Sequence, residues 1–173
     1  MAVRTEREKT GMAEAPPIPK VAVVSTRPET VLDDVARAMR LADYSSTLLG
    51  DAATLLKINI SWQHYYPACS TTPWQLEGVI KTLRADGYEK LIPAHNGTVV
   101  VDPKLGALNN KHQVVERKYR LESVYLDYPP VKWVTFRPKA KMLVLDEIYP
   151  EGIQIPEMFI GKNIVHLPTI KTH

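Results

Sequence analysis

The stretch from Leu55 to Gln75 constrains the fold of this chain more than any other part of the sequence. Residues 55–60 are an apolar run typical of a buried strand, interrupted only by Lys57 and Asn59. Thr72 and Gln75 have the spacing of a capping box, and Pro73 lies at the first helical position between them. A strand, a polar loop and a well-capped helix in this order predict the start of a βαβ unit.

Short apolar runs and helical stripes alternate through the rest of the chain. We expect strands at residues 21–25, 55–60, 91–94, 123–126, 133–136, 142–145 and 164–167. We expect helices ending near residues 42 and 85, one through residues 114–119 capped by Asn110, and a short one at 156–159. Pro93 marks the strand at 91–94 as an edge or irregular strand. This order predicts an α/β fold: a mostly parallel, doubly wound sheet with flanking helices.

The chain has the length and composition of one folded domain with a polar leader. It has 173 residues, of which 45% are hydrophobic. Residues 1–19 combine charges with three prolines and little apolar content, which predicts a disordered leader before an α/β domain at 20–173. The last predicted strand is followed by polar residues and by no covering helix. We therefore expect a domain truncated at its C-terminus.

Composition also narrows the class of partner and the compartment. The net charge of +3 is spread over interspersed acidic and basic residues, so we expect no nucleic-acid partner. No apolar run reaches the roughly 18 residues of a membrane span, so we expect no membrane partner. The N-terminus lacks a secretory signal, and the single cysteine, Cys69, excludes an internal disulfide. These features predict a cytoplasmic protein.

Polar residues follow the predicted strands and mark a candidate site. In parallel doubly wound sheets, ligands bind beyond the carboxyl ends of the strands. The residues at these strand exits are Thr26 and Arg27; Ser61, Trp62 and His64; His95 and Asn96; and Lys171 and His173. We expect the topology to bring them together at the carboxyl-terminal end of the sheet.

Lysine and asparagine side chains at this edge predict a small anionic ligand. Lys57 and Asn59 share one face of their strand and are costly to bury without partners. An ammonium group at a strand end, from Lys57 or Lys171, suits a carboxylate or a phosphate. The alternatives are that Lys57 extends along a sheet edge to water and that Asn59 ties down the loop backbone. The candidate ligand-binding residues are Lys57, Asn59, Ser61, His64, Thr71 and Asn96.

Histidines at the same edge predict proton transfer or metal binding. We select His95, Lys171 and His173 as candidate catalytic residues, and His95 and His173 as candidate metal ligands. The alternative is that each imidazole caps a backbone group or faces water. The sequence does not identify the metal or any other cofactor.

Two segments resemble a known family. The segments LKINISWQHYYPACSTTPWQLEGVI and NIVHLPTIKTH resemble, in this order, the two N-terminal signatures of the domain-of-unknown-function family three-six-two. The matching positions are Lys57 and Asn59 in the first segment and Leu167, Pro168, Lys171, Thr172 and His173 in the second. The resemblance covers about residues 20–173 and implies the N-terminal part of a larger domain. A weaker similarity to lactate-racemase-like proteins implies a nickel-pincer cofactor near Lys171 and His173.

These observations leave two functional hypotheses from different classes. In the first, the chain is the N-terminal half of an enzyme that binds an anionic small molecule or a metal-containing cofactor at the strand ends. This hypothesis requires Lys57, His95 and Lys171 to open into one pocket. In the second, the chain is a non-catalytic module, and the uncovered last strand pairs with a second chain or with a missing C-terminal half.

Overall fold

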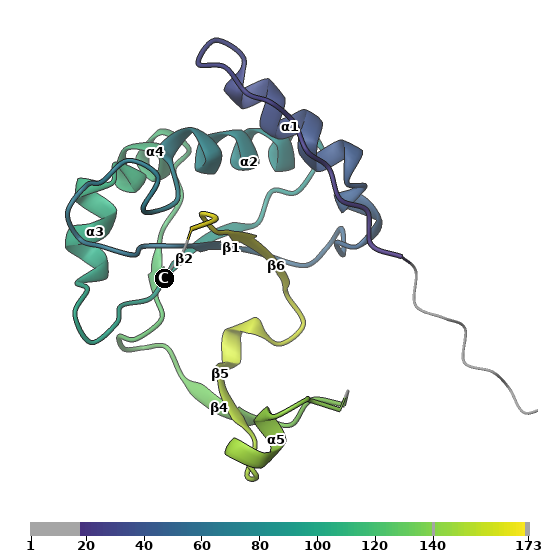
Figure 1. Ribbon diagram of the computed structural model, residues 1–173, viewed down its shortest axis with the longest axis vertical. Helices are drawn as coiled ribbons and strands as arrows, with labels where there is room; N and C mark the ends of the chain where they lie inside the picture. Colours follow the sequence, from purple (N-terminus) through teal and green to yellow (C-terminus); the bar gives the residue numbers. More distant parts are fainter. Residues whose placement is uncertain (1–17, 140, 172–173) are drawn as a thin grey trace, which may run out of the picture.

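A four-stranded parallel sheet forms the centre of the protein. The computed structural model describes residues 18–139 and 141–171. The sheet has the strand order β3-β2-β1-β6, and every neighbouring pair is parallel (Figure 1). Its strands are β1 (Thr54–Ile58), β2 (Leu91–His95), β3 (Val124–Tyr125) and β6 (Asn163–Leu167). The predicted mixed α/β fold with a parallel sheet is therefore confirmed.

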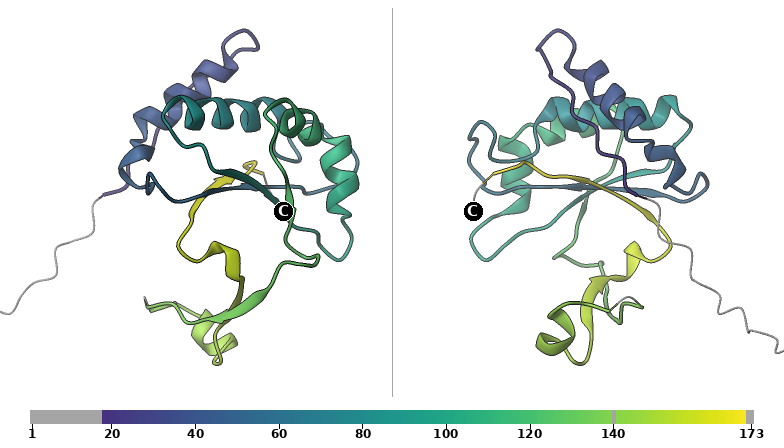
Figure 2. Two further views of the ribbon diagram at one scale, coloured as in Figure 1. Left: turned by 180° about the vertical axis from the view of Figure 1, so that it is seen from behind. Right: turned by 45° about the vertical axis from the view of Figure 1, so that its right-hand side comes forward.

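The helices follow the strands as a βαβ chain requires. They are α1 (Val31–Leu41), the short 3-10 turn η1 (Tyr44–Ser46), α2 (Pro73–Ala85), α3 (Pro103–Asn109) and α4 (His112–Lys118). Helix α2 lies over the sheet and α1 packs against α2, as both views of Figure 2 show. The predicted cap of α2 is present, because the Thr72 hydroxyl accepts a hydrogen bond from the Gln75 N–H at 3.3 Å. The Gln75 side chain does not return to the cap and donates instead to the Pro168 carbonyl at 3.5 Å.

Apolar side chains on the two faces of the sheet form two separate clusters. The larger cluster lies under the helices and includes Leu56, Ile58, Leu76, Ile80, Leu83 and Leu167. The smaller cluster, on the opposite face, contains Leu55, Ala94 and Leu126, with Met158 and Phe159 packed against it. Because side chains alternate along a strand, consecutive residues of β1 belong to opposite clusters.

A two-stranded arm projects from the second face of the sheet. Strands β4 (Trp133–Phe136) and β5 (Ile153–Pro156) pair antiparallel, and the one-turn helix α5 (Leu145–Ile148) lies between them. We call residues 133–156 the arm. Both figures place it apart from the helix-covered sheet (Figures 1 and 2). The short helix η2 (Glu157–Phe159) then leads back to β6.

Two of the predicted strands are absent. Residues 21–25 form no strand, and Val21 and Val23 are almost fully exposed. Their β-branched side chains suit a strand, but no strand of the sheet pairs with this run. Residues 142–145 were also predicted as a strand, yet α5 begins at Leu145, and β4 pairs instead with β5.

The structure corrects two further predictions in the middle of the chain. Strand β2 is not an edge strand, because it lies between β1 and β3. Pro93 is tolerated there because β3 pairs only with Ala94 and His95, which leaves Pro93 a strand neighbour on one side alone. Asn110 does not cap α4 but ends α3, a helix that the sequence analysis missed although Asp102 and Pro103 give it a clear cap.

The structure leaves the two ends of the chain and the overall winding of the sheet untested. Most of the predicted leader, residues 1–17, and the terminal residues 172–173 are not among the described residues. The doubly wound topology and the C-terminal truncation stay predictions. Across residues 18–139 and 141–171, no helix combines the length and apolar character needed to cross a membrane.

A glycine in α2 provides a test of the helix packing over the sheet. A Cβ atom at Gly78 would lie 2.8 Å from the Val35 Cβ on α1, whereas one at Gly50 would meet nothing within 4 Å. We expect Gly78→Val to lower the free energy of unfolding by about 2 kcal/mol, because it forces α1 away from α2. We expect Gly50→Val to change it by less than about 0.5 kcal/mol. Urea denaturation measures both, and equal losses would contradict this packing.

Candidate functional site

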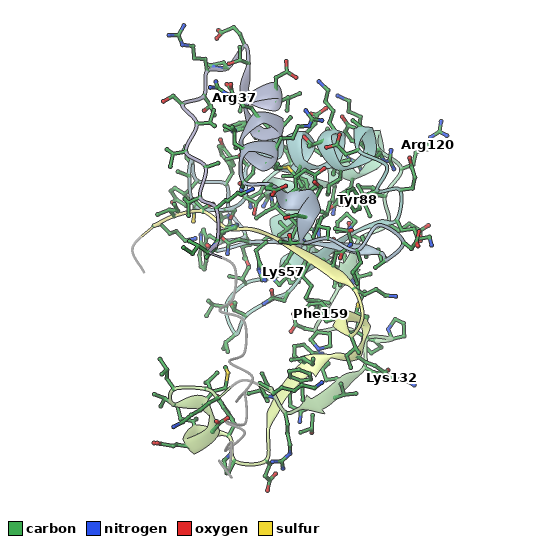
Figure 3. All side chains as sticks on the ribbon, turned by 90° about the vertical axis from the view of Figure 1, so that its right-hand side faces the viewer. Arg37, Lys57, Tyr88, Arg120, Lys132 and Phe159 are labelled. Carbon is green, nitrogen blue, oxygen red and sulfur yellow. The ribbon has the colours of Figure 1, made fainter. Side chains whose placement is uncertain are left out.

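Lys57 lies on the face of the sheet opposite the helices. It follows Leu55 by two residues, and Leu55 belongs to the cluster on that face. Figure 3 shows Lys57 and Phe159 on one side of the sheet and Tyr88 among the helices on the other. In register with Lys57 are Ala94 on β2 and His166 on β6. Ala94 is fully buried and packs with Leu55 and Leu126.

The Lys57 ammonium group is partly removed from water and bonded to neutral oxygens. It donates to the Asn96 Oδ1 and, at 3.3 Å, to the Ile58 carbonyl. Burial lowers the pKa of Lys57, and the charge of Asp127 acts in the opposite direction. Neutral oxygens offset less of the desolvation cost than a carboxylate would, so this cation retains a strong preference for an anion.

A second lysine reaches the same edge from the end of β6. The Lys171 Nζ donates to the Asn59 Oδ1 at 3.0 Å, and the Ser61 hydroxyl donates to the same oxygen at 3.2 Å. Asn59 follows Lys57 by two residues, so their side chains leave the β1 segment on the same side. The structure thus joins five of the predicted residues in two hydrogen-bonded sets: Lys57 with Asn96, and Asn59 with Ser61 and Lys171.

Asp127 belongs to this edge but was missed by the sequence analysis. Its Oδ2 accepts a hydrogen bond from the Gly97 N–H at 2.5 Å, directly after the end of β2. The pKa of Lys57 responds to its charge. Asp127 follows the predicted strand 123–126, so the strand-exit rule applied to that strand would have found it.

Thr71 holds two strand exits together from inside the fold. Its hydroxyl accepts a hydrogen bond from the Asn59 N–H at 2.9 Å and donates to the Leu167 carbonyl. Its backbone N–H also donates to the Asn59 carbonyl at 2.9 Å. Thr71 was selected as a ligand-binding residue, but it is 1% exposed and its hydroxyl is engaged in the fold. It positions Asn59 next to the end of β6.

His95 is separated from Lys57 by the sheet. It directly follows Ala94, so its side chain turns to the helix face, where it is fully buried. The Nε2 atom of His95 lies 2.7 Å from the Glu116 Oε1, and the ring stacks on Tyr125 with centroids 5.2 Å apart. The single pocket that the enzyme hypothesis required of Lys57, His95 and Lys171 is therefore not formed.

His112 forms a buried group with His95 and Glu116. A carbonyl only accepts, so the 2.6 Å contact from the His112 Nε2 to the Thr71 carbonyl places a proton on that nitrogen. The Nδ1 atoms of both histidines are buried, and no described residue bonds to them. Burial lowers the pKa of His112, partly offset by the Thr71 bond. Burial acts to raise the pKa of Glu116, but the hydrogen bonds from His95 and Ser123, together with the charges of His95 and His112, outweigh burial and leave that pKa below its ordinary value.

The remaining predicted residues do not assemble a metal site. His64 is exposed, and its ring centroid lies 5.8 Å from that of Trp62. His173 lies outside the described residues, and the Nε2 of His95 is taken by Glu116. Within the described part of the chain, no three His, Cys, Asp or Glu side chains are grouped as metal ligands. His95 therefore does not fit the predicted role of a metal ligand reached from the strand ends.

Two hollows lie beside the start of α2. The first, of about 280 Å³, has aromatic walls and a floor that includes Ser70 and Thr71; its lining residues are Tyr65, Tyr66, Pro67, Ala68, Ser70, Thr71, Thr72, Pro73, Trp74 and Asn110. The second, of about 490 Å³, is lined by Thr26, Arg27, Pro28, Val31, Leu32 and Trp74. Thr26 and Arg27 were predicted at the carboxyl-terminal end of the sheet with the other strand-exit residues, but the structure places them beside Trp74 at this second hollow.

Comparison with known proteins identifies no relative. No family model, no curated protein and no solved structure matches this chain. The similarities to family three-six-two and to lactate-racemase-like proteins therefore stay predictions.

Removing the Thr71 hydroxyl tests its role in joining the strand exits. We expect Thr71→Val to lower the free energy of unfolding by about 2 kcal/mol, because the Asn59 N–H and the Leu167 carbonyl lose a buried partner. Thr71→Ser keeps the hydroxyl and serves as the control, with a loss below about 1 kcal/mol. Equal losses for the two variants in denaturant titrations would contradict this role.

The buried imidazole of His112 predicts a loss of stability in acid. Because the pKa of His112 lies below its ordinary 6.5, the unfolded chain binds more protons in that range. The stability that this group contributes is complete above pH 6.5 and is lost as the pH falls through the folded-state pKa. Glu116 adds a similar loss below its ordinary 4.5. We expect the melting temperature to fall by several degrees between about pH 7 and about pH 5.

Glutamine at position 112 keeps a donor for the Thr71 carbonyl but does not titrate. His112→Gln should therefore flatten the fall in melting temperature, measured by circular dichroism. His64→Gln removes an exposed histidine instead and should leave the fall unchanged. Parallel curves for the wild-type protein and His112→Gln would show that His112 is not the responsible group.

Proposed function

We propose that the chain is the N-terminal part of an enzyme domain that binds a small anionic molecule at the carboxyl ends of the parallel strands. The observation that carries the proposal is the half-buried Lys57 ammonium group, which has neutral hydrogen-bond partners on the face without helices. Lys171 adds a second cation at the same edge through Asn59. Two cations held by amide oxygens suit a carboxylate or a phosphate.

In this proposal the residues at the strand ends have distinct roles. Lys57 and Lys171 bind the anion, and Asn59 and Asn96 orient the two ammonium groups through their side-chain oxygens. Ser61 supports Asn59. His95 faces the other side of the sheet, so we do not assign it proton transfer at the strand ends; Lys57 and Lys171 are the candidates that we propose for that step. The lowered pKa of Lys57 favours such a role.

The resemblance to lactate-racemase-like proteins offers a nickel-type cofactor as another ligand for the same strand ends. Lys171 is exposed at the end of β6, where the resemblance to lactate-racemase-like proteins expects a lysine. His95 is buried and bonded to Glu116, so it does not supply a ligand there. We therefore base the proposal on anion binding and assign no reaction step to a metal.

Anion titrations test the proposal directly. We expect inorganic phosphate or malonate to bind the purified chain in isothermal titration calorimetry. Lys57→Gln should weaken the binding at least roughly tenfold, because it removes the charge-assisted hydrogen bonds to the anion. Lys90→Gln is the matched control. It removes the same charge from an exposed lysine just before β2, at the amino-terminal end of the strands.

The pH dependence of binding identifies the responsible group. Since the pKa of Lys57 is below 10.5, its ammonium form is lost at a lower pH than that of an exposed lysine. Affinity should fall as the pH rises through the pKa of Lys57. Equal affinities for Lys57→Gln, Lys90→Gln and the wild-type protein would reject the site.

The position of β6 supports a second candidate function. β6 is the outermost strand of the sheet, and within the described residues its outer side pairs with no strand. An uncovered strand edge is a template for pairing with another chain. In this alternative the chain is a non-catalytic module that binds a partner through β6. Protection of the Ile164 and His166 amides against hydrogen exchange only in a complex would favour it.

A further inference from the structure

The smaller hollow beside the start of α2 has aromatic walls and no charged lining. It has a volume of about 280 Å³, and the described residues that line it are all uncharged. Tyr65, Tyr66 and Trp74 are 54%, 60% and 47% exposed, so a ligand can reach each of these rings. Small-molecule sites combine such apolar and aromatic walls with a few placed polar groups, in pockets of roughly 300–1,000 Å³. This hollow is just below that range, which suits a ligand of one ring.

The side-chain oxygen of Asn110 is an unused acceptor in this hollow. Asn110 lines the hollow although it is only 2% exposed. Its Nδ2 donates to the Trp62 carbonyl at 3.2 Å and to the Gly106 carbonyl at 2.9 Å. Both carbonyls only accept, so the amide nitrogen must face them and the orientation of the amide group is fixed. The Oδ1 atom accepts a hydrogen bond from no described residue, which leaves it for a donor in the hollow.

The hydroxyl group of Ser70 is an unused donor in the same hollow. Ser70 is 4% exposed and lines the hollow. Its oxygen accepts a hydrogen bond from the Ser61 N–H at 3.2 Å, but its O–H donates to no described atom. A nearly buried donor or acceptor without a partner is costly. Ser70 and Asn110 therefore indicate a ligand that both donates and accepts hydrogen bonds.

Aromatic walls and neutral polar groups match the chemistry of a sugar. The face of an aromatic ring is the negative part of its quadrupole and attracts the C–H groups on the apolar side of a sugar ring. Each sugar hydroxyl both donates and accepts, which suits the Asn110 Oδ1 and the Ser70 O–H. An anionic ligand would need a cation, and neither Lys57 nor Lys171 lines this hollow.

We propose that this hollow binds a neutral sugar ring. The ring packs against Tyr66 and Trp74, and its hydroxyl groups bond to the Asn110 Oδ1 and the Ser70 O–H. The site is independent of the proposed anion site, because the two share no ligand-binding side chain.

Saturation-transfer NMR on the whole chain tests the proposal, because it detects weakly bound ligands. The probes are the methyl glycosides of glucose, galactose, mannose and N-acetylglucosamine, and at least one should receive saturation on its ring C–H protons. Tyr66→Ala and Trp74→Ala should each weaken its binding at least roughly fivefold, because each removes one aromatic wall. Tyr149→Ala is the matched control, since Tyr149 is 53% exposed on the arm, and it should leave the affinity unchanged.

Two trisaccharides, maltotriose and cellotriose, distinguish a free sugar from one unit of a longer chain. Tighter binding of either than of methyl glucoside would assign the hollow to a unit within a glycan, and equal binding would assign it to a single sugar.

Three results would overturn the proposal. Transfer to none of the glycosides and trisaccharides would show that no sugar binds, and transfer to adenine alone would assign the hollow to a flat aromatic ring. Binding that survives both Tyr66→Ala and Trp74→Ala would place the sugar elsewhere. Circular dichroism should show unchanged secondary structure in both variants, because both side chains are exposed. Tyr66→Phe keeps the ring and should bind within about twofold of the wild-type protein.

Discussion

The hydroxyl of Thr71 is the interaction on which the candidate site depends. It joins the residue after β1 to the last residue of β6, two segments separated by more than a hundred positions in the sequence. His112 holds the Thr71 carbonyl from the helix side, so α4 fixes the same point. The Thr71 hydrogen bonds position Asn59, and Asn59 in turn positions Lys171 by accepting its hydrogen bond. A buried hydroxyl that both donates and accepts is costly to replace, which gives the edge a defined geometry.

The alternation of side chains along the strands divides the polar residues into two groups with different surroundings. Lys57 faces the side without helices and keeps contact with water, whereas His95 faces α4 and is enclosed. Both groups are near the same strand ends, but the sheet separates them. The open group suits recognition of a charged ligand. The enclosed group, with its bond to Glu116, ties α4 to the sheet.

The sequence predicts those features that follow from local pattern. The cap at Thr72, the βαβ order and the positions of β1 and β6 needed only apolar runs and turn chemistry. The sequence pattern also gathered Lys57, Asn59, Asn96 and Lys171 at one edge, since parallel strands end there together. It did not determine which face His95 occupies, because that depends on the register of a single residue. The sequence also did not predict that β4 pairs with β5, because β5 lies after α5 and no local signal specifies such a distant contact.

We infer that Lys57 lies in a site built for an anion and is not simply a lysine at a sheet surface. Crystals soaked in selenate test it most directly, because anomalous scattering locates the anion without ambiguity. We expect a selenate oxygen within hydrogen-bond distance of the Lys57 Nζ and a second contact from Lys171. Selenate bound elsewhere on the protein, with Lys57 still bonded only to Asn96 and Ile58, would contradict it.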